Sequence, residues 1–187
     1  MNLVLTKNFY SWMRTVLLGS STSISSSTTS SAGISGTVDT VGDMTTIDGK
    51  PITKLTQFGF SSYIKNSVTL NCWSSDNSTS YTYFAVGSNN NEATENDHAF
   101  SAYTSTDCSV SLDVNSNPKI VNEKAQITFI VSVEAKNNIT IGEIGLLKAI
   151  QSGGTEFSRF LFGRVALDTP IELGAGESAT FQISIEI

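Results

Sequence analysis

The sequence predicts an all-β protein: an antiparallel β-sandwich or jelly-roll-like fold with a short N-terminal helix and an extended arm. The chain closes on "SATFQISIEI", in which apolar and polar residues alternate with the period of two that a half-buried strand requires. Similar short runs recur along the second half, with turn residues between them. Ser, Thr, Asn and Gly abound while only 15% of residues are charged, which suits strands and turns better than long solvated helices.

The first expected element is a helix over residues 5–17. Thr6 is placed to cap its start. Its apolar residues recur at three- and four-residue spacing, with polar residues elsewhere around the turn, and they are Leu5, Phe9, Trp12, Met13, Val16 and Leu17. An isolated short helix is marginal without a partner surface. The stripe therefore either folds back onto the sandwich or docks on a neighbouring subunit, and in the second case these six residues form an assembly interface.

A polar arm follows the helix. Residues 19–36, "GSSTSISSSTTSSAGISG", lack the apolar periodicity of a helix or a strand, so they are expected to form a flexible linker or an extended arm. We therefore divide the chain into residues 1–36, the helix and Ser/Thr-rich arm, and residues 37–187, the β-sandwich domain.

Strand signals follow from residue 45 onward. Asp48-Gly49 lies between two short extended runs and predicts a hairpin turn of the primed type, which needs positive φ. Along residues 126–135, the side chains of Ile127, Phe129, Val131 and Val133 are expected to point inward, and Ile130 breaks the alternation. Strands are also expected over residues 67–73, 80–86, 108–114, 139–147 and 157–167, followed by the closing strand.

Length and charge exclude several classes of protein. At 187 residues the chain suffices for a single sizeable core, which buries roughly 70% of the unfolded surface. A net charge of -6 argues against nucleic acid as a ligand, because such binding needs clustered Lys and Arg. No run approaches the ~20 apolar residues of a membrane span, and Lys7 and Arg14 interrupt any signal sequence. We expect a protein that binds no membrane and is made and kept in a cytoplasm until assembly or lysis.

The sequence offers little catalytic chemistry. It contains no nucleotide-binding, zinc-protease or nucleophile-elbow motif, and its one histidine, His98, is expected to be a loop residue that is hydrogen-bonded or solvated. Glu92, Glu95 and Asp97 share one loop, where they could form a hydrolytic carboxylate pair, gather Ca²⁺ with nearby asparagines, or remain a solvated acidic loop. The last is the favoured interpretation. We expect no enzyme, no cofactor and no metal.

The cysteines and aromatic residues leave alternatives open. Cys72 and Cys108 are either two buried thiols or a disulfide, and the first is favoured. Trp73, Tyr81 and Tyr83 lie on adjacent expected strands, where they either pack in a core or interface or form a platform that stacks on sugars. The platform would make the protein a carbohydrate-binding or host-adhesion module, which is the alternative function.

The second half of the chain resembles a family. The runs "FAVGSNNNEATENDHAF", "ITIGEIGLL" and "FLFGRVALDTPIELGAGESATFQISIEI" are similar to a segment of structural proteins of tailed bacteriophages, including crAss-like phages, over residues 84–187. The chain departs from that pattern at Asn89 and Ala93, where a glycine and a proline are expected. It keeps Gly87, Asp97, Glu143-Ile144-Gly145-Leu146, Arg164, Asp168-Thr169-Pro170 and Gly176.

The resemblance implies a virion structural protein, such as a capsid decoration protein, a head fibre or a tail component. Its expected partners are other virion proteins and further copies of itself. Its expected location is the virion, after synthesis in the host cytoplasm. The N-terminal helix and arm are expected to hold the sandwich to its neighbours.

Overall fold

The structure is a computed structural model that describes residues 1–18, 37–56, 80–113, 119–121, 123–151 and 157–186. These residues form one helix, α1 (Lys7–Leu18), and ten strands. The strands are β1 (Val4–Leu5), β2 (Thr37–Thr45), β3 (Pro51–Thr56), β4 (Ser80–Gly87), β5 (Cys108–Asp113), β6 (Lys119–Val121), β7 (Lys124–Ala135), β8 (Ile139–Gln151), β9 (Phe157–Leu173) and β10 (Ser178–Glu186). No described helix has the length and hydropathy needed to cross a membrane.

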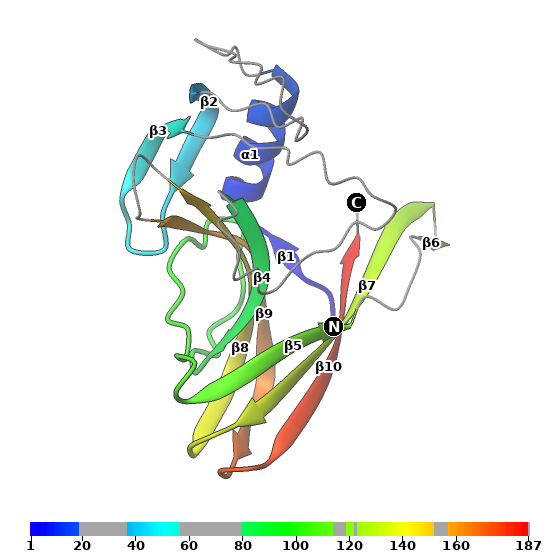
Figure 1. Cartoon of the computed structure of the whole chain (residues 1–187). Helices are drawn as coiled ribbons and strands as arrows, with labels where there is room; N and C mark the ends of the chain where they lie inside the picture. Colours follow the sequence, from blue (N-terminus) through cyan, green and yellow to red (C-terminus); the bar gives the residue numbers. More distant parts are fainter. Residues whose placement is uncertain (19–36, 57–79, 114–118, 122, 152–156, 187) are drawn as a thin grey trace, which may run out of the picture.

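Two antiparallel sheets carry the fold (Figure 1). Sheet I has the strand order β1-β9-β8-β4, and sheet II has the order β10-β7-β5, with β6 paired to the start of β7. A separate two-stranded ribbon of β2 and β3 packs beside α1. All pairs of named strands are antiparallel, so the prediction of an all-β fold is confirmed.

Buried apolar side chains from both sheets form one cluster, the main core. The rings of Phe84 on β4 and Phe129 on β7 meet with their centroids 5.4 Å apart. The predicted alternation is confirmed on the closing strand β10, whose Phe181, Ile183 and Ile185 are all buried. Period-two alternation thus directs one face of each sheet toward the other.

A smaller apolar cluster lies on the opposite face of sheet I. It contains Ala85, Leu147 and Leu161 from three strands and Phe100 from the connection between β4 and β5, residues 88–107. A Cβ atom on Gly145 would lie 2.6 Å from the Phe100 ring, so the glycine makes room for that ring. The connection therefore covers the outer face of sheet I.

The N-terminal element differs from the prediction. Leu5, expected on the helix, belongs to β1, which pairs with β9, and α1 begins at Lys7. The Thr6 carbonyl accepts bonds from the backbone N–H groups of Phe9 and Tyr10, as at a helix start. Its hydroxyl, however, donates to the Leu161 carbonyl at 2.5 Å instead of capping the helix. A tertiary hydrogen bond thus replaces the predicted local one.

The hairpin between β2 and β3 is confirmed, but its predicted tight turn is wrong. Thr45 pairs with Pro51, so residues 46–50 form the turn. Gly49 has the expected positive φ of 85°, whereas Asp48 does not. Mutual hydrogen bonds between Thr46 and Lys50 close this longer loop. The predicted arm at 19–36 and the strand at 67–73 lie outside the described residues.

Candidate functional site

A buried arginine organises the most distinctive site. Arg164 on β9 is 3% exposed and Glu143 on β8 is 1% exposed. The Arg164 Nε atom donates to Glu143 Oε2 at 2.6 Å, and its Nη1 atom donates to Asp97 Oδ2, also at 2.6 Å. We name these three residues the Arg164 cluster. Because buried charges need both partners and hydrogen bonds, an arginine held by two carboxylates is a satisfied arrangement.

The Arg164 cluster fastens the 88–107 connection to sheet I. The guanidinium donates from Nη2 to the Asn91 carbonyl at 2.7 Å and from Nη1 to the Glu92 carbonyl at 3.5 Å. Asp97 also accepts bonds from the backbone N–H and the hydroxyl of Thr94. The side chain of a single arginine thus fixes three points of a connection that has no regular secondary structure.

Glycines make this close approach possible. A Cβ atom on Gly87 would lie 2.6 Å from Glu143 Oε1 and 2.7 Å from the Ser101 carbonyl, so a larger residue at this position would displace Glu143.

A bulge in β9 lies next to the cluster. Ile141 pairs with Ile171 and Glu143 pairs with Ala166, so Gly142 alone faces the four residues 167–170. This bulge contains the Asp168-Thr169-Pro170 run. Gly176, with φ of 86°, serves the turn before β10.

The pKa directions reflect the shared guanidinium. Burial raises the pKa of Glu143 above its ordinary value, although Arg164 pulls it down. Burial would also raise the pKa of Asp97, but hydrogen bonds from Thr94 and Arg164 outweigh it, and the pKa lies below its ordinary value. Two carboxylates compete for one cation, and the more exposed of them keeps its charge more readily.

The other loop residues singled out by the sequence do not gather around a reaction centre. The side chains of Glu92, Glu95 and His98 are exposed, and the Glu95 carbonyl accepts a bond from the backbone N–H of Lys7. Asp97 accepts a hydrogen bond from Arg164. The prediction of a solvated acidic loop therefore holds for Glu92 and Glu95 but not for Asp97. Within the described residues no three His, Cys, Asp or Glu side chains are placed to hold a metal ion.

Among the three residues of the predicted aromatic platform, only Tyr83 has a described side chain. Tyr83 is half-buried and packs against the smaller apolar cluster. Trp73 and the side chain of Tyr81 lie outside the described residues. Cys108 is a buried free thiol, and burial raises its pKa, while Cys72 lies outside the described residues.

Three of the six residues predicted to form an assembly interface pack on their own chain. Leu5 is buried in the main core, and Phe9 and Trp12 are half-buried against it. Their rings contact Phe162 with centroid separations of 5.8 and 5.4 Å. Met13 is exposed. Val16 and Leu17 lie within α1, and their side chains are outside the described part of the structure.

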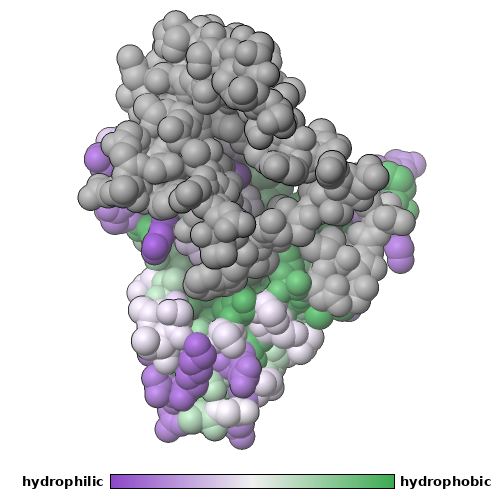
Figure 2. Space-filling view, in the orientation of Figure 1, coloured by the Kyte–Doolittle hydropathy of each residue, from purple (hydrophilic) through white to green (hydrophobic). Residues whose placement is uncertain are grey.

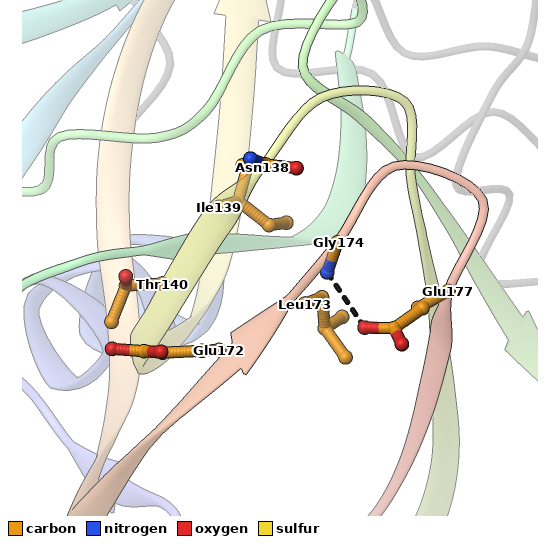
Figure 3. A pocket seen from close by; sticks show the side chains of 7 residues that line it. All are labelled: Asn138, Ile139, Thr140, Glu172, Leu173, Gly174 and Glu177. Atoms are coloured by element: carbon orange, nitrogen blue, oxygen red, sulfur yellow. Dashed lines mark hydrogen bonds between the residues drawn. The ribbon is translucent and has the colours of Figure 1, made fainter.

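Two open pockets lie at the surface of the described residues. The first, about 430 Å³, is formed by the start of β8, the end of β9 and the turn that follows (Figure 3). There the Glu177 carboxylate accepts a bond from the Gly174 N–H at 2.7 Å and so serves the turn. The second, about 570 Å³, lies between the N-terminal residues Asn2 and Val4, the 88–107 connection and β9.

Sequence reasoning missed Glu143 and Arg164 as partners. Each is a single charged residue inside an apolar strand, in "ITIGEIGLL" and "FLFGRVAL", and the two charges are opposite. Charged residues are rarely buried unless they are paired, so this pattern could have indicated the ion pair. Comparisons with family models, curated proteins and solved structures gave no match.

Proposed function

We propose that the protein is a structural component of a tailed-phage virion, as a capsid decoration protein, a head fibre or a tail component. One observation supports this more than any other. The resemblance to phage structural proteins depends on positions scattered along the sequence, and four of them, Gly87, Asp97, Glu143 and Arg164, meet in one partly buried arrangement. A chain whose charged side chains pair with one another and hold its own backbone has the ordered structure that a building block requires.

The arrangement also suits a protein that presents a surface to neighbours. The charges of the Arg164 cluster are paired with one another, and Arg164 holds the backbone of the 88–107 connection. Asn89, Asn90 and Glu92 in this connection are exposed. An ordered loop loses little conformational entropy when it meets a partner. The expected partners are other virion proteins and further copies of this chain, and the expected location is the virion.

Particle incorporation tests the proposal. A tagged chain is produced in host cells during phage growth, and particles are separated from soluble protein on a density gradient. We expect the tagged chain to sediment with the particles, and an equally tagged unrelated protein to stay in the soluble fractions. A chain found in the soluble fractions alone would contradict the proposal, and glycan binding by that chain would support the carbohydrate-binding alternative instead.

A further inference from the structure

The first residues of the chain join the edges of both sheets. We define the seam as residues 161–164 of β9 together with residues 182–184 of β10. The Met1 ammonium donates to the Gln182 carbonyl, and the backbones of Met1 and Leu3 exchange hydrogen bonds of 2.8 and 2.9 Å with Ser184. Residues 4 and 5 then pair with β9. Figure 1 shows this blue segment running from the N-terminus toward α1.

The side chains of this segment are part of the core that they close. Leu3 and Leu5 are buried in the main core, and Thr6 is fully buried. A Cβ atom on Gly163 would lie 2.8 Å from Leu3 Cγ, so the glycine leaves space for Leu3. A chain whose seam is empty therefore exposes apolar side chains of both sheets, and the seam has a shape that accepts this segment.

The helix that follows is held in the same way. The Asn8 side chain donates to the Thr45 carbonyl at 2.7 Å and accepts from the Thr45 N–H at 2.8 Å, and Phe9 and Trp12 pack on Phe162. Thr45, Phe162 and the seam residues, which bind residues 1–18, all lie after residue 36 in the sequence. None of these interactions depends on the two partners belonging to the same copy of the chain.

Residues 19–36 tether this segment to the rest of the chain. They are mostly Ser and Thr. A chain of 18 residues reaches at most about 65 Å, so its length allows residues 1–18 to reach a neighbouring copy. In an assembly of identical subunits each neighbour would offer a further copy of the seam, so a segment from the next copy would compete with the chain's own segment.

We propose that residues 1–18 of one copy fill the seam of a second copy, so that the interactions that close one chain also link neighbouring subunits. This inference rests on the proposed structural role, because a virion would bring many copies of the chain close together and so favour exchange. Exchange of an identical element costs little, because the same hydrogen bonds and apolar packing form between two chains as within one. The partner that the seam fits is thus a second copy of this chain.

Isotope mixing tests the exchange with the full-length native chain. Equal amounts of unlabelled and ¹⁵N-labelled protein are unfolded together, refolded and concentrated to about 2 mM, within the millimolar range of effective concentrations typical of short linkers. An amine-reactive cross-linker then joins Met1 to Lys124. These amines are close, because Glu186 accepts a bond from Asn2 and pairs with Lys124. The control is the link between Lys119 and Lys124 within the β6–β7 hairpin.

Exchange predicts a molar mass above the 20.0 kDa of one chain and Met1–Lys124 links of mixed isotope content, approaching half of all such links. The Lys119–Lys124 links stay unmixed. A single-chain mass at this concentration, or an oligomer whose Met1–Lys124 links are unmixed, would overturn the inference. Either result leaves the particle test unaffected, so the failure of exchange and the failure of the proposed function are distinguishable.

Discussion

Arg164 holds the 88–107 connection at three points. Replacing it with methionine removes the guanidinium and leaves Glu143 buried without its partner. We expect Arg164→Met to lower the free energy of unfolding by about 3–5 kcal/mol, because a broken buried ion pair leaves an uncompensated charge. Urea melts measure the change.

The matched control for this prediction is Arg159→Met, on the same strand but with an exposed side chain. That change is expected to stay within about 0.5 kcal/mol. Equal losses from the two substitutions would show that the Arg164 cluster contributes nothing beyond the general effect of replacing an arginine on β9.

Lys148 adds a pH dependence. Burial lowers its pKa from the usual 10.5 to about 8, and its Nζ lies 5.7 Å from the centre of the Trp12 ring. Between these two values the unfolded chain binds more protons than the folded one, so the free energy of unfolding gains a contribution that rises with pH. We expect Lys148→Met to remove this rise and to stabilise the protein at pH 7, as thermal melts across the range would record.

The control is Lys124→Met, since the Lys124 side chain is 64% exposed. It should preserve the pH dependence between 8 and 10.5. A wild-type protein whose stability is flat across that interval would contradict the assignment.

At this scale the sequence predicts types of residue better than their partners. Asp97 stands out in the sequence as an acidic loop residue, yet its partner Arg164 lies 67 positions away. No periodicity relates a loop carboxylate to a strand arginine. The pairing arises from the way the 88–107 connection crosses sheet I, which local patterns do not encode.

Among the elements, the closing strand β10 gives the sharpest test of the core. Phe181 is 4% exposed in the main core. We expect Phe181→Ala to cost about 3–5 kcal/mol, from reduced burial and the cavity left behind. The neighbouring change Thr180→Ala, at an exposed position, should cost less than about 0.5 kcal/mol. Similar melts for the two variants would argue against burial of the alternating face.

A second prediction concerns the short strand β1. Leu5→Ala is expected to lower the free energy of unfolding by about 2–5 kcal/mol, because Leu5 is buried in the main core. Lys7→Ala, two residues on at an exposed position, is the control. If both variants melt like the parent, residues 1–6 do not close the seam in solution.

Alternation in the sequence predicts the strands that have one buried face, such as β7 and β10, whereas β8 and β9 are buried on both faces. It predicts β4, β5, β7 and β10 close to their observed bounds. It misses β1 and β6, since strands of two and three residues are too short to show a period. It also places Leu5 on the helix, because its spacing to Phe9 fits a helical stripe while the hydrogen bonds that hold it belong to β9.

For the whole molecule, the all-β class follows from composition and alternation, whereas the attachment of the N-terminal segment does not. The sequence leaves open whether the apolar stripe folds back or docks on a neighbour, and the structure seats Leu5, Phe9 and Trp12 on the core. Figure 2 shows apolar and polar surface interspersed on the described part of the visible face. The proposed exchange between copies reconciles this packing with a role in assembly.

The copy number of the chain in purified particles tests the central claim, a structural role in a virion, most directly. Identical subunits usually occupy symmetric sites. Quantitative mass spectrometry of gradient-purified particles is therefore expected to give the same number of copies per particle in every preparation. That number should be a multiple of the rotational order of the symmetric site. Absence from the particles, or an amount that varies between preparations and falls with further purification, would contradict a structural role.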